Sequence, residues 1–519
     1  MEQNLRSSMN VVHTWAGVVV GAVLFAVFWM GTLSVYDREI DRWMAPMTRV
    51  AMPDKPVSFD ALRGTYDAAV TAHAPSWTML QPTERQPVVR IVYRDGPQVL
   101  SRYFDPVTGA ALPDTGTWAG TRFFYPFHYR LHLKAWDIGE WLVGIAAMTM
   151  LLLCVSGLVI HRKMIAEFFT WRTRKKSARM VLDLHTVAGL LGLPFNFMVA
   201  LSGLVILSIT FFPSGWQSSY PNKQSFNAEA YSAYARPKAK NPGTLMSLDM
   251  LAQKAEQMWH GGKPWAIVVQ HPGDAAAFVT VYQSFDLGIV RSAPAIHFDA
   301  ATGAVLHQSK EMRPIAKAQR FISGMHQIQF RHWTLRALYF ALGLFGCVLI
   351  LTGFLFWLQS RRRNHAAEPW SGVRVMEAVA ISSTAGIIVA SVSFMVINRI
   401  LPLGVSFMGI ERYALEIWVF YLVWLATLAH AWWRPQMAWA GQCRAIAGLA
   451  MLAVVLNWMT TGDHLLRSLS APHLWPVAGV DLGLLLLASV AFGMSRWLLR
   501  AERPIRSGAP DLNRVSSHA

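Results

Sequence analysis

Six histidines gather at the ends of apolar segments in this chain. The sequences "VVHTWAGVVVG" and "DLHTVAGLLG" each open a long apolar segment with a histidine. Neutral imidazole is a favoured ligand of haem iron and other transition metals. A single histidine at a membrane interface is ordinarily explained by packing, but two clusters at matching positions predict metal or haem chemistry. The clusters are His13, His161 and His185 at one face and His128, His132 and His326 at the other.

Haem iron needs two axial nitrogens that face each other across an apolar slot. His13 with His185 is the natural pair at the first face, although His161 could replace either. At the second face His326 pairs with His132 or His128, which are four residues apart and share one face of a predicted helix. We therefore expect two haems per chain, with His13, His185, His132 and His326 named first as iron ligands and His128 and His161 as their alternatives. Recurrent glycines allow close helix packing or room for the macrocycle: Gly17, Gly21, Gly144, Gly157, Gly189, Gly203, Gly343, Gly346 and Gly353.

The elements that position these histidines are membrane helices. The chain has 519 residues, of which 53% are hydrophobic, and its apolar residues form long runs that a soluble fold could not bury. Each run reaches the roughly 20 residues that span a bilayer. The sequence predicts an α-helical polytopic membrane protein with about eight transmembrane helices: 11–36, 138–160, 184–211, 333–358, 373–397, 412–433, 444–461 and 476–499.

The net charge of +17 is concentrated in connections between helices. By the positive-inside rule these connections and both termini are cytoplasmic, and nucleic acid is not an expected partner. Three cysteines form neither a CxxCH haem attachment site nor CxxC pairs. The basic residues are Arg162, Lys163, Arg172, Arg174, Lys175, Lys176, Arg179, Arg361, Arg362 and Arg363.

The first 363 residues read as two copies of one unit. His13 matches His185, and later "SFDALRGTYDAAV" matches "SLDMLAQKAEQMW", each with a serine that starts a predicted helix. "YFDPVTGAAL" and "HFDAATGAVL" then predict hairpin turns, and Gly157 matches Gly353. The copied unit is a helix, an outer α+β module and a second helix. The last four helices show no such copy.

These boundaries divide the chain into nine expected units. They are helix one (1–36), outer module one (37–135), helix two (136–161), a basic cytoplasmic loop (162–183), helix three (184–211), outer module two (212–330), helix four with its basic end (331–363), a four-helix membrane bundle (372–500) and a cytoplasmic tail (501–519).

The chain resembles the PepSY-associated transmembrane proteins of bacteria, often described as iron-regulated membrane proteins. The resemblance rests on "HTWAGVVVGAVLFAVFWMGTLSVYDREIDRWM", "FHYRLHLKAWDIGEWLVG", "VSGLVIHRKMIAEFFTWR" and "GMHQIQFRHWTLRALYFALGLFGCVLILTGF". It implies a multi-pass protein of the inner (plasma) membrane with two periplasmic PepSY-like modules, b-haem and a link to iron uptake. The matched histidines are His13, His128, His132, His161, His185 and His326, whereas His332 stands where the family usually has a small residue.

The implied activity is reduction of a ferric siderophore or other ferric chelate in the periplasm, by electrons that cross the membrane. The sequence contains no GxSxG, HExxH, P-loop or GxGxxG motif, so the electron donor is a quinol or a cytoplasmic reductase. Two alternatives stay open on the residues alone. One is a non-redox accessory protein that binds a siderophore or peptide, and the other is a transporter component that uses the last four helices.

Overall fold

A computed structural model describes most of the chain, and it contains the expected helices. It covers residues 2–62, 70–71, 73–96, 98–161, 177–231, 233–284, 288–290, 293–365 and 372–501. The basic residues of 162–176 and the tail from 502 lie outside this part. Within it, eight helices are long and apolar enough to cross a membrane: Asn4–Ser34, Ala135–Ile160, Arg179–Phe211, Trp333–Arg361, Gly372–Ile400, Arg412–Trp433, Pro435–Thr461 and Pro472–Arg500. The polytopic α-helical fold is therefore confirmed.

Three helices begin earlier than the apolar pattern predicts, and the first of them starts at Glu2 instead of 11. The third long helix starts at Ser177, seven residues before the expected 184, and the seventh starts at Pro435 instead of 444. All three added stretches carry polar side chains, which a helix end tolerates where it reaches the membrane interface. Apolar content alone therefore underestimated the length of these helices.

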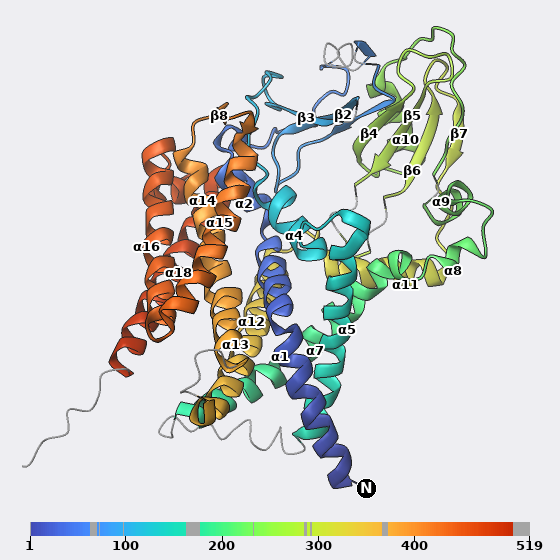
Figure 1. Ribbon diagram of the computed structural model, residues 1–519. Coiled ribbons are helices and arrows are strands. Elements are labelled where there is room, and N and C mark those ends of the chain that lie inside the picture. The colour runs from blue at the N-terminus through green and yellow to red at the C-terminus, as the bar shows by residue number, and fades with distance from the viewer. Residues whose placement is uncertain are drawn as a thin grey trace, which may run out of the picture.

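The first four long helices form a ring of four, in which the two copies of the unit occupy equivalent positions. They are α1 (Glu2–Ser34), α5 (Ile138–Ile160), α7 (Ser177–Phe211) and α12 (Trp333–His365). α1 packs against α5 and α12, and its copy α7 packs against the same two helices. Exchange of the two copies thus leaves the ring unchanged, which gives the bundle a pseudo-two-fold axis (Figure 1).

The two outer modules build one continuous sheet rather than two. Its order is β3-β2-β1-β4-β5-β6-β7, and all neighbours are antiparallel. The central β1–β4 pair joins the modules and removes the edge that each would otherwise expose. The strands are β1 (Ser76–Leu80), β2 (Val89–Asp95), β3 (Gln98–Phe104), β4 (Pro264–Gln270), β5 (Phe278–Gln283), β6 (Ala295–Asp299) and β7 (Val305–Gln308).

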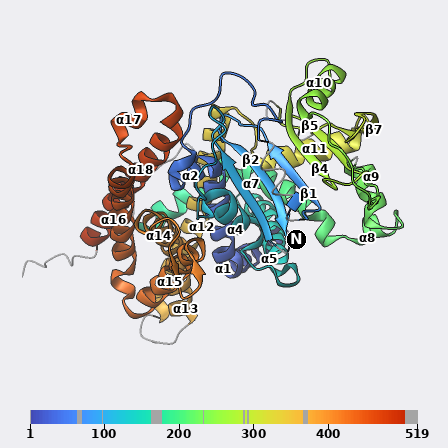
Figure 2. The same cartoon turned by 90° about the horizontal axis from the view of Figure 1, so that it is seen from above.

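The sheet lies over one end of the four-helix ring, and the N-terminus lies at the other end (Figures 1 and 2). We call these the sheet side and the N-terminal side of the membrane region. Shorter helices join the sheet to the long helices on the sheet side: α2 (Asp37–Met44), α4 (Tyr125–Arg130), α8 (Ser214–Gln217), α9 (Lys223–Tyr231), α10 (Leu248–Met258) and α11 (Pro314–Gln327). The short helical segments are η1 (Pro46–Thr48), η2 (Ala119–Phe124) and η3 (Ala135–Asp137).

The duplicated serine and aspartate residues hold the modules together reciprocally. Ser247 is the N-cap of α10, as the sequence predicted. The Asp60 carboxylate accepts hydrogen bonds from the Ser247 hydroxyl at 2.6 Å and from the Asp249 backbone N–H at 3.2 Å. In return the Asp249 carboxylate accepts from the Ser58 hydroxyl. Each module therefore supplies an aspartate to the serine of the other.

The two predicted hairpin turns share one geometry, but only the second is closed by a strand. The Asp105 carboxylate accepts from the Thr108 N–H at 2.8 Å, and the Asp299 carboxylate accepts from the Thr302 N–H at 3.0 Å. In the second copy the turn closes the β6–β7 hairpin. In the first copy the returning chain forms an isolated bridge to β3 in place of a strand. The hairpin prediction holds fully in the second module.

The last four membrane helices form a bundle that contacts α1 and α2 of the first copy and α12 of the second. The span of α13 (Gly372–Ile381), η4 (Ser382–Gly386) and α14 (Ile387–Ile400) is its interior helix, because 89% of the most apolar window of that span is buried. Around it stand α15 (Arg412–Trp433), α16 (Pro435–Thr461) and α18 (Trp475–Ala501). The small elements are β8 (Ser406–Phe407), β9 (Ile410–Glu411), α17 (Leu465–Ser470) and η5 (Pro472–Leu474).

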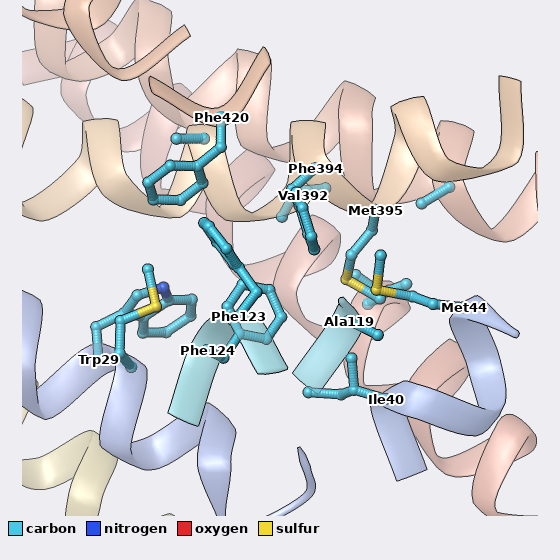
Figure 3. Packing of buried hydrophobic residues seen from close by; sticks show 14 of the residues in the cluster. Trp29, Ile40, Met44, Ala119, Phe123, Phe124, Val392, Phe394, Met395 and Phe420 are labelled. Carbon is cyan, nitrogen blue, oxygen red and sulfur yellow. The ribbon is translucent and has the colours of Figure 1, made fainter. Parts of the chain in front are cut away.

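An aromatic core joins this appended bundle to the duplicated unit. Phe123 of η2 stacks on Phe394 of α14 with ring centroids 4.4 Å apart, and it meets Phe420 of α15 edge-on at 5.0 Å. Trp29 of α1 lies in the same cluster (Figure 3). The first copy contributes most of the unit's residues in this core and the second contributes Cys347 of α12, so the appended bundle contacts the two copies unequally.

Candidate functional site

His13 and His185 face each other on the N-terminal side of the four-helix ring. Their ring centroids are 6.4 Å apart, and the ring planes are nearly perpendicular at 88°. The Nδ1 atom of His13 lies 2.9 Å from the Ser156 hydroxyl, which donates its own hydrogen to the Leu152 carbonyl. Nδ1 must therefore be the donor in the His13–Ser156 bond. The remaining lone pair of His13 is on Nε2.

His185 is held in the same way by the equivalent helix. Its Nδ1 lies 3.0 Å from the Leu349 carbonyl and 3.2 Å from the Thr352 hydroxyl, which donates to the Val348 carbonyl. Nδ1 again carries the proton. Thr352 follows Ser156 by 196 residues, the same offset that relates Gly353 to Gly157, so the duplication copied the hydroxyl partner together with the helix.

A cavity of about 420 Å³ opens between these two histidines. It is within the range of small-molecule and cofactor sites. His161, the residue that caps the end of α5, lines the same cavity, so the structure brings together all three histidines predicted for this face. The remaining walls combine apolar side chains and glycines of the four ring helices, such as Leu153 and Gly189, with polar residues that include Asn196 and Arg361.

His128 and His326 form the corresponding pair on the sheet side. Their centroids are 5.8 Å apart, and the planes are 28° from parallel. Nδ1 of His128 donates to the Val27 carbonyl at 2.8 Å. Nδ1 of His326 lies 3.0 Å from the Ser202 hydroxyl, which donates to the Met198 carbonyl at 2.6 Å, so this Nδ1 is also a donor.

His132 does not pair with His326, which corrects the first choice made from the sequence. The helix α4 ends at Arg130, and Leu131 and His132 both adopt left-handed backbone angles, with φ of 50° and 56°. His128 and His132 therefore do not share a helical face. Nε2 of His132 donates to the Phe123 carbonyl at 2.9 Å, and its Nδ1 lies 3.2 Å from the Tyr421 hydroxyl. Both ring nitrogens of His132 are engaged, and its proton is on Nε2. His332 is exposed at the start of α12.

Four of the histidines thus share one tautomer and one arrangement. Their Nδ1 atoms donate to protein oxygens, and within the described residues no hydrogen bond is found for their Nε2 atoms. This is the arrangement of metal-bound histidine, whose second nitrogen is fixed by an outer hydrogen bond. Two imidazole nitrogens at about 2 Å from one metal ion, the length known from zinc sites, hold the ring centroids about 6 Å apart. The observed spacings of 5.8 and 6.4 Å match that requirement.

Burial keeps the sheet-side imidazoles neutral. Burial lowers the pKa of His326 to about 3, and the neighbouring His128 adds to the effect. Burial also lowers the pKa of His128. Neutral imidazole is the form that binds a metal ion, and burial favours that form in both residues. The described residues contain no group of three or more His, Cys, Asp or Glu placed to hold a bare metal ion.

Glycines give the four histidine rings their space. A Cβ atom at Gly157 would lie 3.5 Å from the His13 ring, and one at Gly353 would lie 3.4 Å from the His185 ring. At Gly203 it would lie 3.1 Å from His326, and at Gly31 it would lie 2.7 Å from His128. Reasoning from the sequence missed Gly31, although it precedes Gly203 by 172 residues, the offset that relates His13 to His185.

Other glycines that recur on these helices serve helix packing. A Cβ at Gly144 would meet the Phe211 ring, one at Gly343 would meet Thr32, and one at Gly346 would meet Phe28. The packing explanation offered from the sequence therefore holds at these three positions. Glycines near the ends of the helices face histidines, and several of the others bring neighbouring helices close.

Comparison with known proteins places the duplicated unit in a family. Residues 11–360 match the family model described as PepSY-associated TM region. The chain is also similar to an uncharacterized protein of Pseudomonas aeruginosa, with 27% identity over 392 residues that cover 70% of this chain and 92% of the relative. The family match ends just before the appended bundle, and it includes every one of the paired histidines.

Proposed function

We propose, from the premise that this chain belongs to the PepSY-associated transmembrane family, that it is a b-haem oxidoreductase of the bacterial inner membrane. It reduces a ferric siderophore or a related ferric chelate on the sheet side, which we assign to the periplasm. This assignment puts the basic end of α12 and both termini in the cytoplasm, in keeping with the positive-inside rule.

The observation that carries the proposal is that two pairs of histidines recur, one on each side of the membrane region. Each pair joins equivalent positions of a duplicated unit, and each ring presents an unprotonated Nε2 while its Nδ1 is fixed by a hydrogen bond. A histidine that served only as an interfacial residue would not require a glycine against its ring and a buried hydroxyl or carbonyl at its Nδ1. Recurrence of that set at both membrane faces supports a cofactor at each.

The residues of this chain have separable tasks in the proposed function. His13 and His185 would hold one haem, and His128 and His326 would hold the other. Bound b-type haem supplies one-electron transfer. Ser156, Thr352 and Ser202 fix the ring orientations and keep the proton on Nδ1.

Reduction of the chelate would itself release the metal. Siderophores hold ferric iron through hard oxygen donors, and ferrous iron is a softer ion that such ligands bind far more weakly. The chain then needs neither a nucleophile nor a hydrolytic triad. The electron donor is a membrane quinol or a cytoplasmic reductase, and the appended bundle has no task in this scheme.

Haem content tests the proposal directly. Protein purified from haem-replete cells should show a Soret band, sharp α-bands after dithionite reduction, and two haems per chain in a pyridine haemochrome assay. Addition of a ferric siderophore should then oxidise the reduced protein. The loss of the α-bands measures this reductase step. A colourless preparation would refute the proposal and favour a non-redox binding protein of iron uptake.

A further inference from the structure

A large crevice lies on the sheet side between the first copy of the duplicated unit and the appended bundle. Its volume is about 1140 Å³. The deep end is lined by Ala22, Val23 and Ala26 of α1 and by Ser383 of η4, all within membrane spans. The mouth is lined by Trp118 and Lys134, which lie outside the spans. A ligand that fills the crevice must therefore have an apolar part in the membrane and a more polar head near the interface.

His132 and Tyr421 supply the polar contact inside the crevice, and both line it. Because Nε2 of His132 donates to the Phe123 carbonyl, its Nδ1 is an acceptor, and the Tyr421 hydroxyl donates to it at 3.2 Å. The Tyr421 oxygen keeps lone pairs for a further donor. The dyad can accept a hydrogen bond from a ligand hydroxyl, and Tyr421 can instead donate to a ligand carbonyl.

The duplication shows that His132 is not a structural requirement of the copied unit. His326 follows His128 by 198 residues, and the same offset makes Phe330 the counterpart of His132 in the second copy. Phe330 is buried in an apolar cluster with Val35 and Tyr339. In the first copy two successive residues adopt left-handed backbone angles, and His132 faces the appended bundle. Such strain is retained where the surrounding structure or a function requires it.

The walls of the crevice are flat and aromatic. Trp118 stacks on Tyr413 with centroids 4.9 Å apart and planes 8° from parallel. Phe127 and Trp424 line the crevice nearer the dyad, with centroids 6.0 Å apart. Aromatic rings prefer offset-stacked and edge-on contacts with one another. The walls thus suit a planar ring that carries hydroxyl or carbonyl groups.

The cations near the crevice are engaged by other groups, although Arg130 and Lys134 lie near enough to His132 to lower its pKa. Arg130 pairs with Glu140 at 3.3 Å. Arg122 and Lys134 both lie over the face of Trp118 at the mouth, at 5.5 and 6.0 Å from the ring centroid. Cation–π contacts of this kind engage these cations at the rim. The position beside the dyad therefore favours a neutral head group over a phosphate.

We propose that this crevice binds the head group of a membrane quinol or quinone, with its isoprenoid tail along the small residues of α1. The inference deepens the proposed function, because it identifies the class of electron donor that the function leaves open. The role of the quinol as electron donor rests on the proposed function, whereas its binding in the crevice does not. It also gives the appended bundle a task, since Tyr421 and Trp424 come from α15.

Binding of decylubiquinone to the purified full chain in detergent tests the proposal. Tyr421→Phe removes one hydroxyl and leaves the ring, so the dissociation constant should rise about five- to tenfold. His132→Phe, the residue of the other copy, should weaken binding at least as much. Tyr339→Phe is the matched control, because it removes a buried tyrosine hydroxyl far from the crevice, and it should bind as the unchanged chain does. An azidoquinone photolabel should attach to peptides that contain 118–134 or 413–424.

Three results would overturn the proposal: equal affinity in all variants, a photolabel attached elsewhere, or displacement of decylubiquinone by phosphatidylglycerol. The last would mark a lipid site, and Arg122→Gln with Lys134→Gln should then weaken lipid binding. Haem content of the same preparations separates the two proposals. Quinone binding by haem-free protein would support this inference and refute the proposed function, and the reverse result would do the opposite.

Discussion

His128 and His326 stack with ring centroids 5.8 Å apart on the sheet side, although 198 residues separate them in the chain. Each ring lies against a glycine, Gly31 or Gly203, that belongs to the first helix of a copy. The pair is therefore a product of the duplication. Its closeness selects His128 over His132 as the partner of His326, a choice that the sequence left open.

Replacement of the two sheet-side candidates should have opposite effects on haem content. His128→Ala removes a ring whose Nε2 is available, so the chain should lose one of two haems. His132→Ala removes a ring whose nitrogens both face protein groups, and it should retain two haems. The pyridine haemochrome assay measures both. Loss of haem from His132→Ala alone would refute the assignment.

A side chain at Gly31 should displace the sheet-side histidine pair although neither histidine is replaced. A Cβ there would lie 2.7 Å from Nδ1 of His128, so Gly31→Val must push the ring away from Val27. We expect loss of about one haem per chain. Gly448→Val in α16 is the control, because no atom lies within 4 Å of its Cβ position. Size-exclusion chromatography checks that both variants are folded, and equal haem content in both would contradict the packing argument.

Glu39 pairs with one fully buried and one partly exposed arginine at the junction of helices and sheet. Arg336, which is fully buried, and Arg85 each lie 2.8 Å from the Glu39 carboxylate. Glu39→Gln leaves both guanidinium groups without that charge, and loss of one partner of a buried pair costs about 3–5 kcal/mol. The apparent Tm in detergent should fall accordingly.

Glu311→Gln provides the control for this prediction. Its pair with Lys317 is exposed on both sides, and exposed pairs contribute little to stability. A fall in Tm as large as that of Glu39→Gln would show that burial does not decide the effect.

His132 should make the stability of the protein depend on pH. Burial lowers its pKa to about 4, the hydrogen bond to Phe123 opposes the shift, and Lys134 and Arg130 add to it. The unfolded chain then binds a proton between pH 6.5 and 4 that the folded chain does not, so stability falls as pH falls through that window. The contribution is at most about 3 kcal/mol, and less after solvent screening.

Comparison with His132→Phe isolates this contribution. The phenylalanine does not titrate, so the fall in Tm between pH 6.5 and 4 should be smaller in that variant than in the unchanged chain. Differential scanning fluorimetry in detergent at several pH values measures both. Identical pH profiles would show that His132 is solvated and titrates as it does in the unfolded chain.

The eight spans and the duplication could be predicted because both produce patterns within short stretches of the sequence. Apolar runs of membrane length and repeated motifs need no tertiary information. The union of the modules could not be predicted, because β1 and β4 lie almost 190 residues apart and their pairing has no local signal. The choice between His128 and His132 depended on a helix end at Arg130, where Leu131 and His132 adopt left-handed angles without a glycine to announce them.

The register of the β1–β4 pair bears on the ancestry of the chain. Thr78 pairs with Val268, and Met79 pairs with Ile267. With the offset of 189 residues between the copies, Ile267 is the counterpart of Thr78 and Val268 is the counterpart of Met79, so each pair is the copy of the other. A strand that pairs with its own copy in this way is self-complementary, as in the isologous interface of a two-fold dimer. The sheet is thus the geometry of a homodimer fixed in one polypeptide. Fusion of the copies freed the halves to diverge, and the appended helices contact them unequally, at α1 and α2 in the first copy and at α12 in the second.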